Sequence, residues 1–184
     1  MSAQGQVPGG RPSEGVRRQR PLYTAAERAR RDATVWTVVQ GVLAPLQFLV
    51  FLVSLVLVIR YLATGAGYEI ATQSILAKTA LLYLIMVTGA IWEKVVFGQY
   101  LFAPAFFWED VFSFAVIALH TLYLWALFTG AVGPTGQMVI ALAAYGFYVV
   151  NAFQFLWKLR QARLQGEVTS GQGTIILTVD KVAG

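Results

Sequence analysis

The chain has 184 residues, of which 57% are hydrophobic and only 12% are charged, and it contains no cysteine. A soluble domain normally carries about a quarter charged residues, so this composition is typical of an integral membrane protein. The lack of cysteine excludes disulfides, iron–sulfur clusters and thiolate-ligated zinc, and one histidine cannot supply both axial ligands of a bis-histidine haem. The net charge is +5, and the positive residues are segregated relative to the apolar segments, which indicates membrane topology rather than nucleic-acid binding.

The residues before the first apolar segment are polar and basic. Residues 1–19 are rich in Gly, Pro, Ser and Arg, and we expect them to be disordered because they can bury no core. Thr24 and Glu27 have the spacing of a capping box, which predicts a short basic helix through Arg31. We therefore assign residues 1–33 to a cytoplasmic basic tail with a short helix.

Four apolar segments follow, and each is long enough to cross a bilayer as a helix of about 20 residues. They are Val35–Ile59, Ile75–Ile91, Val111–Phe128 and Val139–Trp157. The expected fold is all-α: an integral membrane bundle of four transmembrane helices over residues 34–160, with disordered tails. Residues 161–184 are expected to form a flexible cytoplasmic tail.

The distribution of positive charge predicts the orientation of the bundle. Arginines precede the first segment, and a lysine with two arginines follows the last. Positive residues normally stay on the cytoplasmic side of a membrane. The connections at Thr64–Gly67 and Gly130–Pro134 contain turn residues and little positive charge, so they suit the periplasm. Both termini and the loop Trp92–Asp110 are then expected in the cytoplasm.

Charged residues are rare within these segments and gather at one end of them. Glu93, Glu109 and Asp110 lie at the cytoplasmic ends of the second and third segments, with Lys94 among them. Ion pairing at the membrane surface accounts for them without a catalytic role, and Asp110 could also act as the N-cap of the third helix. Lys78, about one turn inside the second segment, is expected to extend its amine to the interface.

Polar residues also occur at membrane depth in the third and fourth segments. His120 follows Glu109 by eleven residues, so the two project from nearly the same helix face about 16 Å apart along the axis. A neutral imidazole bonded to a neighbouring helix is the simpler interpretation of His120. Asn151, Gln154 and Lys158 recur at helical spacing, and such a stripe either joins helices or lines a cavity.

Five strings in the chain resemble one protein family. They are Tyr23–Arg28, Arg31–Trp36, Gly41–Phe48, Ile91–Gly98 and Phe106–Asp110. The resemblance is to the 3-vinyl bacteriochlorophyllide hydratase family and covers about Leu22 to Arg163. It implies a hydro-lyase that adds water to the C3 vinyl group of chlorophyllide a or vinyl bacteriochlorophyllide and gives the 3-(1-hydroxyethyl) product.

The resemblance also implies the setting of the enzyme. It predicts a bacterial inner membrane, either cytoplasmic or intracytoplasmic and photosynthetic, and contact with other pigment-biosynthesis enzymes. The substrate is a magnesium chlorin, so we expect no cofactor or metal of the protein's own. No nucleic-acid partner is expected, and the sequence leaves the oligomeric state open.

Hydration of a vinyl group requires an acid for the terminal carbon and a base for the proton of water. We therefore expect the catalytic residues to be Glu109, Glu93 and Asp110. Glu109 is the first candidate for the proton donor because it shares a helix face with His120 and follows an aromatic segment.

The macrocycle needs apolar walls and a few polar contacts. The expected substrate-binding residues are Trp92, Lys94, Trp108, His120, Asn151 and Gln154. Lys94 could bind the propionate side chain, and His120 could approach the magnesium, although an axial water is an equal competitor.

A non-catalytic pigment-binding or assembly protein is the alternative from a different functional class. Such a protein needs a ligand to the magnesium and apolar walls, but it needs no carboxyl group. The clustered acids therefore favour the hydratase.

The orientation can be tested with reporters. A reporter fused after Arg163 should be cytoplasmic, and a tag inserted at Gly65–Gly67 should be accessible from the periplasm, because positive loops resist translocation. Protease protection of the tag in spheroplasts would measure this. A periplasmic C-terminus would contradict the four-span arrangement.

Overall fold

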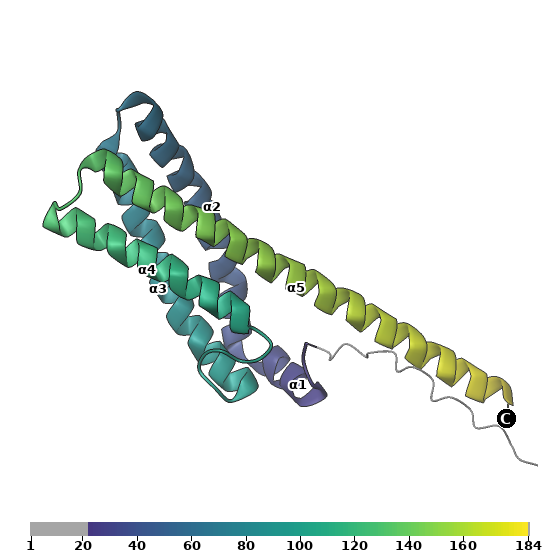
Figure 1. The fold of residues 1–184 in the computed structure, drawn as a ribbon. Coiled ribbons are helices and arrows are strands. Elements are labelled where there is room, and N and C mark those ends of the chain that lie inside the picture. The colour runs from purple at the N-terminus through teal and green to yellow at the C-terminus, as the bar shows by residue number, and fades with distance from the viewer. Residues whose placement is uncertain (1–21, 184) are drawn as a thin grey trace, which may run out of the picture.

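The computed structural model of the protein describes residues 22–183 and is built from helices. In chain order these are α1 (Ala25–Ala33), α2 (Val35–Thr64), α3 (Tyr68–Phe97), α4 (Phe107–Thr129) and α5 (Pro134–Ala183), shown in Figure 1. No strand occurs within this described range. Helices α2, α3 and α4 and the first half of α5 are long and apolar enough to cross a membrane. The predicted all-α bundle of four membrane-capable helices is confirmed.

The helices extend beyond the apolar segments that the sequence outlined. α3 begins at Tyr68 rather than Ile75 and ends at Phe97 rather than Ile91. Backbone hydrogen bonding continues through polar residues until a residue breaks it, so apolarity alone underestimates helix length. At Gly98 the chain takes a left-handed conformation with φ of 85°, which glycine adopts without a Cβ clash, and α3 ends there.

The last helix shows the largest difference in extent. The fourth segment was predicted to end at Trp157, but α5 runs on to Ala183 and extends away from the bundle (Figure 1). No proline interrupts residues 158–183, so helical hydrogen bonding can propagate from the membrane-capable part. The domain boundary at residue 160 stays a prediction. The tail expected over residues 1–19 lies outside the described residues.

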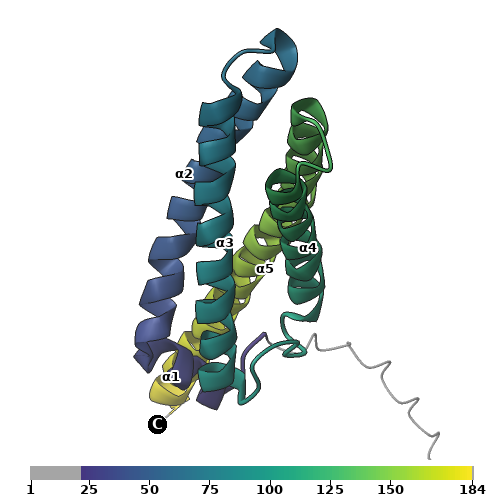
Figure 2. The ribbon, with the colours of Figure 1, turned by 90° about the vertical axis from the view of Figure 1, so that its left-hand side faces the viewer.

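The bundle consists of two helical hairpins. α2 packs along α3, and α4 packs along α5, while the contacts between α3 and α4 are few. Figure 2 shows the two hairpins side by side. Their shared core contains Phe51, Ile75, Leu82, Val116, Tyr123, Met138 and Tyr145.

Hydroxyl and amide groups join the helices at membrane depth. The Ser54 hydroxyl hydrogen-bonds to Ser74 at 2.7 Å and to Tyr145 at 2.6 Å, which links α2, α3 and α5. The Gln40 amide donates to the Thr88 hydroxyl at 2.8 Å and links α2 with α3. Such bonds are required because no water is available to satisfy polar groups in the hydrocarbon core.

The short helix α1 caps the end of α3. The predicted capping box is present, since Thr24 N–H donates to Glu27 at 2.7 Å and Glu27 N–H donates to the Thr24 hydroxyl at 3.2 Å. The first of these bonds also lowers the pKa of Glu27 below its ordinary value. Arg30 donates to the Val96 carbonyl at 2.8 Å. The N-terminal helix is therefore tied to the last turn of α3.

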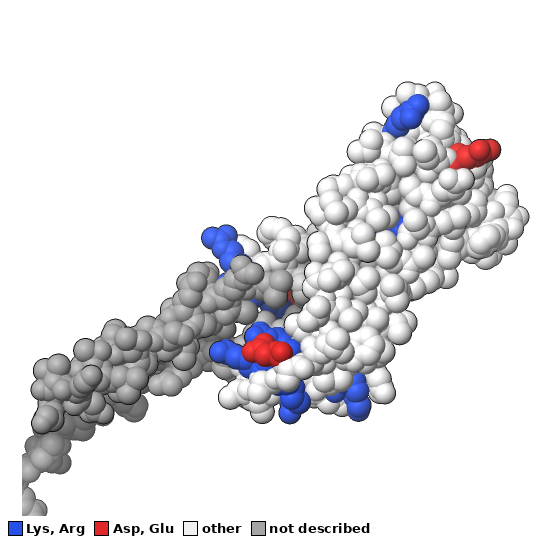
Figure 3. All heavy atoms as spheres, turned by 180° about the vertical axis from the view of Figure 1, so that it is seen from behind, with Lys and Arg blue, Asp and Glu red and all other residues white. Residues whose placement is uncertain are grey.

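Charged side chains gather towards the two ends of the bundle, and a broad band between them is almost free of charge (Figure 3). The end at α1 carries Arg28, Arg30, Arg31, Lys94, Lys158 and Arg160, whereas the opposite end carries Arg60 and Glu69. This arrangement matches a bundle that crosses a bilayer with its more basic end on one side.

Candidate active site

The three carboxyl groups singled out in the sequence converge where α3 ends and α4 begins. Glu93 lies four residues before the end of α3, and Glu109 and Asp110 lie in the first turn of α4. All three side chains are buried, and Glu93 is only 5% exposed. Together with Lys158 of α5 we call them the carboxyl cluster.

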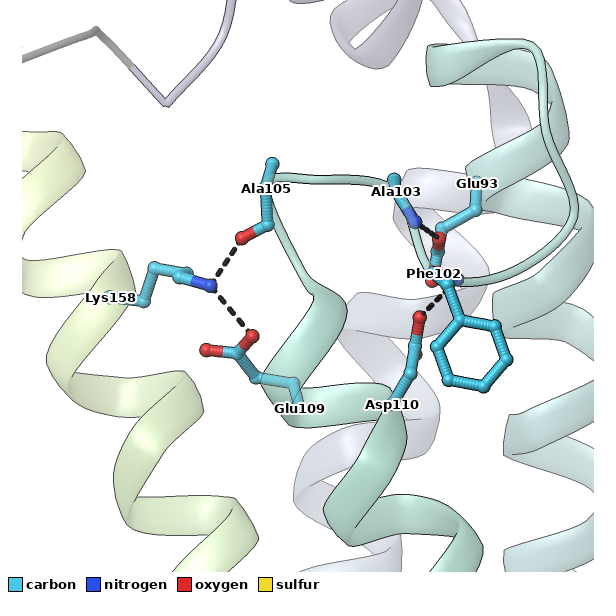
Figure 4. Close-up of polar contacts among 7 residues, drawn as sticks. All are labelled: Glu93, Phe102, Ala103, Ala105, Glu109, Asp110 and Lys158. Carbon is cyan, nitrogen blue, oxygen red and sulfur yellow. Dashed lines mark hydrogen bonds and ion pairs between the residues drawn. The ribbon is translucent and has the colours of Figure 1, made fainter.

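Glu93 and Asp110 hold the loop between α3 and α4. The Ala103 N–H donates to Glu93 at 3.1 Å, and the Phe102 N–H donates to Asp110 at 2.6 Å (Figure 4). Phe102 has a φ of 58°, a left-handed conformation that non-glycine residues rarely adopt. Two hydrogen bonds to carboxyl groups at adjacent amides stabilise this unusual backbone.

The Glu93 and Asp110 carboxyl groups lie beside each other, because they accept from the adjacent amides of Ala103 and Phe102 (Figure 4). Two ionised carboxylates side by side repel each other, which favours a proton on one of the two. Paired carboxyl groups in different surroundings are the arrangement that divides acid and base roles in enzymes.

Glu109 has a different partner. Its carboxylate accepts from the Lys158 amine at 2.6 Å, and the same amine donates to the Ala105 carbonyl (Figure 4). Lys158 thus connects α5 with the first turn of α4 and with the loop before it. The ion pair neutralises Glu109, so the negative charge of the cluster is left to the Glu93–Asp110 pair.

The interpretation of Asp110 as a helix N-cap is wrong. α4 begins at Phe107 with Phe106 as its N-cap residue, and the Asp110 N–H already donates to the Phe106 carbonyl at 3.0 Å. Asp110 therefore lies one turn inside the helix. Its carboxyl group is directed back to the Phe102 amide of the loop.

The two candidate tryptophans lie in different surroundings. Trp92 packs against Phe97 and Phe106 with ring centroids 5.7 and 5.6 Å apart, and its indole N–H donates to the Thr37 hydroxyl at 2.9 Å. Trp108 is 64% exposed. The structure thus places Trp92 in an aromatic cluster beside the loop and Trp108 on the outer surface of α4.

The Lys94 side chain bonds to the backbone at the end of its own helix, α3. The side chain is exposed, and its amine donates to the Gly98 carbonyl at 2.8 Å and lies 5.2 Å from the Tyr100 ring centroid. A cation bonded to the last carbonyls stabilises a helix terminus. The carboxyl cluster has Lys158, not Lys94, as its paired cation.

His120 lies deeper in the bundle and is fully buried. Its Nδ1 is 2.8 Å from the Val116 carbonyl, which can only accept, so Nδ1 carries the proton and Nε2 has a free lone pair. Among the described residues Nε2 has no hydrogen-bond partner. His120 follows Asp110 by ten residues, which corresponds to about 15 Å along the axis of α4.

Asn151 and Gln154 lie on α5 on the bundle side of Lys158. The Asn151 amide donates to the Ser113 hydroxyl of α4 at 2.8 Å, so the polar stripe does join helices. The Asn151 and Gln154 side-chain oxygens are buried and lack partners in the part of the chain that the structure describes. They provide acceptors between the carboxyl cluster and His120.

Two lysines lie in surroundings that the sequence did not reveal. Lys158 was assigned to the polar stripe, and its pairing with Glu109 depends on how α4 packs against α5. The expectation that the Lys78 amine reaches the interface is wrong: the side chain is fully buried, because α3 begins ten residues before it, at Tyr68. The sequence did not reveal this burial, because the depth of Lys78 was judged from an apolar segment that begins later than α3 does.

No three metal-ligating side chains of His, Cys, Asp or Glu converge within the described chain. The unpartnered Nε2 of His120 is the group there that could contact a metal carried by a ligand. The absence of a cofactor stays a prediction.

Comparison with known proteins gives one consistent result. The family model described as 2-vinyl bacteriochlorophyllide hydratase matches residues 23–161. A curated protein of that name from Rhodobacter capsulatus is 73% identical over 159 residues, which is 86% of this chain and 92% of the relative. Another from Cereibacter sphaeroides is 74% identical over 157 residues, or 85% and 97%. No solved structure matches the chain.

Loss of the Lys158 amine should destabilise the site. Lys158→Met leaves the Glu109 carboxylate and the Ala105 carbonyl without their partner, and we expect it to lower the free energy of unfolding by about 1 to 3 kcal/mol. Thermal unfolding of the detergent-solubilised protein measures this effect. In the Lys158→Met/Glu109→Gln double variant no unpaired charge remains, so its loss should be smaller than the sum of the single losses. Additive losses would contradict the pairing.

Proposed function

Because the chain belongs to the 2-vinyl bacteriochlorophyllide hydratase family, we propose that its carboxyl cluster performs the hydration reaction. The chain is a hydro-lyase of bacteriochlorophyll biosynthesis that adds water to the vinyl group of a chlorin precursor. The vinyl position is called 2 in one numbering of the tetrapyrrole ring and 3 in the other. The observation that supports the site is the convergence of the buried Glu93 and Asp110 carboxyl groups on two adjacent amides of the loop.

Hydration of the vinyl group takes place in two steps. An acid gives its proton to the terminal carbon, and the positive charge that develops on the carbon next to the ring is delocalised into the macrocycle. A water oxygen then bonds to that carbon, and a base takes the surplus proton from the water. The product carries a 1-hydroxyethyl group. The acid has lost one proton and the base has gained one, so the two groups together hold as many protons as before.

The Glu93–Asp110 pair fits both roles. Asp110 accepts the shorter bond from a backbone amide, 2.6 Å against 3.1 Å for Glu93, and hydrogen bonds to a carboxylate favour its ionised form. We therefore assign the proton to Glu93 as the acid and the carboxylate to Asp110 as the base. Because the two carboxyl groups lie beside each other, the proton that Asp110 takes from water can return to Glu93 after each turnover.

Glu109, the first candidate from the sequence, is better suited to positioning. A carboxylate in an ion pair has no proton to donate, and Lys158 holds Glu109 in such a pair. Through Lys158, Glu109 fixes the Ala105 carbonyl and thus the loop whose amides bind Glu93 and Asp110. This role makes Glu109 necessary for geometry rather than for proton transfer.

The distance of His120 from the cluster bears on the magnesium ligand. Ten residues of helix separate it from Asp110, about 15 Å along the axis, which is longer than the distance from the vinyl group to the magnesium of one chlorin. A chlorin that reacts at the carboxyl cluster is therefore out of reach of His120 as an axial ligand. We propose an axial water on the magnesium in the reacting complex.

The basic end of the bundle supports a cytoplasmic position for the active site. The carboxyl cluster lies at the end that carries the arginines of α1 and α5, and positive residues stay on the cytoplasmic side. We propose that the chlorin lies within the membrane and that water reaches the cluster from the cytoplasm.

Incubation of membranes that contain the protein with chlorophyllide a tests the function. Hydration should increase the pigment mass by one water and shift its absorption, because the vinyl group leaves conjugation with the ring. Membranes without the protein are the control. Pigment that binds without gaining mass would support the non-catalytic alternative.

Replacement of Glu93 tests the acid. In Glu93→Gln the side-chain oxygen can still accept from the Ala103 amide, so the bond to the loop is kept and the transferable proton is removed. General acid catalysis contributes a factor of about 10² to 10⁴, so turnover should fall by that factor while pigment binding persists.

Two further variants control this experiment. Glu69→Gln changes an exposed carboxyl group at the opposite end of α3 and should leave turnover unchanged. Glu109→Gln should cost less than Glu93→Gln, because it weakens positioning and leaves the acid in place. The reverse order would identify Glu109 as the proton donor and contradict our assignment.

A further inference from the structure

Lys78 is a buried cation that the hydration chemistry at the carboxyl cluster does not use. It lies on α3 ten residues after the helix begins, about 15 Å from its first residue, and its side chain is fully buried. A lysine at such depth in a membrane protein is costly and calls for a partner or a function.

The surroundings of the Lys78 amine are polar but contain no anion. In the orientation that satisfies both groups of the Gln47 amide, its oxygen accepts from Lys78 at 2.9 Å and its nitrogen donates to the Leu81 carbonyl at 3.1 Å. The amine also lies 3.7 Å from the Tyr148 ring centroid. Within residues 22–183, as far as side chains are described, no carboxylate lies within 4.0 Å of it.

These contacts leave hydrogen-bond donors of the Lys78 amine unused. A lysine ammonium has three donors, and the Gln47 oxygen accepts from one of them. The Tyr148 ring attracts a cation but does not neutralise it. His120 is nearby as the Nδ1–H tautomer, so it supplies no negative charge. The remaining donors fit a carboxylate, which would complete a buried ion pair.

We propose that Lys78, with Gln47 and Tyr148 beside it, binds the carboxylate of the substrate's propionate side chain. This inference rests on the proposed function, because a chlorophyllide carries this group as a free acid. Lys94, the propionate partner expected from the sequence, is instead exposed and bonded to the Gly98 carbonyl at the end of α3.

The position of Lys78 relative to the carboxyl cluster sets the length that the substrate and the two side chains must span together. Lys78 precedes Glu93 by fifteen residues, or about 22 Å along α3. The vinyl and propionate groups are carried by neighbouring pyrrole rings of the chlorin and do not cover this length alone, so the Glu93 and Lys78 side chains must extend towards the pigment from both ends. A chlorin with its vinyl group at Glu93 would then extend its propionate towards Lys78 and pass the unpartnered oxygens of Asn151 and Gln154.

Access to Lys78 requires the two hairpins to move apart. The contact between α3 and α4 is small, and the Tyr83–Thr121 hydroxyl bond at 2.8 Å is one of its polar links. The hairpins also meet between α2 and α5, where the Ser54 and Tyr145 hydroxyls bond at 2.6 Å, so we place the entrance for a flat pigment from the bilayer on the α3–α4 side, which has few contacts.

The test compares chlorophyllide a with its methyl ester, which lacks the carboxylate but keeps the vinyl group. The wild-type protein should prefer the free acid in kcat/KM by about tenfold to a hundredfold, the worth of a hydrogen bond between charged groups. Lys78→Met retains side-chain length and removes the charge, so it should lose activity on the acid and abolish the preference while the ester is hydrated as before. A lysine with a purely structural role would change both substrates equally.

The remaining outcomes are also decisive. If wild-type protein hydrates both substrates equally well, the inference is overturned whether or not Lys78→Met inserts normally. If Lys94→Met instead abolishes the preference, the propionate binds at the membrane surface and the inference fails. If the wild-type protein hydrates neither substrate, the proposed function itself fails, which separates the two results.

Discussion

In the hydrocarbon core of a bilayer no water can replace a missing hydrogen bond, so each polar group of the bundle must find a partner within the protein. Ser54 meets this constraint by bonding to α3 and α5 together, and Gln40 meets it by bonding to Thr88. Where the constraint is met, the polar group holds helices together. Where it is met only in part, as at His120 and Lys78, hydrogen-bonding capacity is left unused within the described residues.

The same constraint shapes the loop between α3 and α4. Phe102 has a backbone conformation that a non-glycine residue adopts only when its surroundings enforce it, and the amides of Phe102 and Ala103 are bound by two carboxyl groups. The bonds act in both directions, since the amides also fix the two carboxyl groups beside each other. In the reaction that we propose, the loop therefore supports the acid–base pair, because a reacting group must be held in place before the substrate binds.

The site also illustrates how like residues take different roles through their surroundings. Glu109 and Asp110 are adjacent in sequence and point to different partners, because successive residues of a helix project about 100° apart. Glu109 faces α5 and its lysine, while Asp110 faces the loop and Glu93. Glu109 has a cation beside it and Asp110 has a second carboxyl group beside it, and the roles that we propose for them rest on this difference.

The sequence by itself determined the membrane-capable helices, the capping box of Thr24 and Glu27, and the gathering of acids at one end, because these depend on local composition and spacing. The family followed from strings such as Ile91–Gly98. Only the tertiary structure decided that Lys158 pairs with Glu109, that Glu93 and Asp110 bind adjacent amides of one loop and that Lys78 is buried. Each of these depends on which helix faces touch, and residues far apart in the chain are brought together by packing that no local pattern encodes.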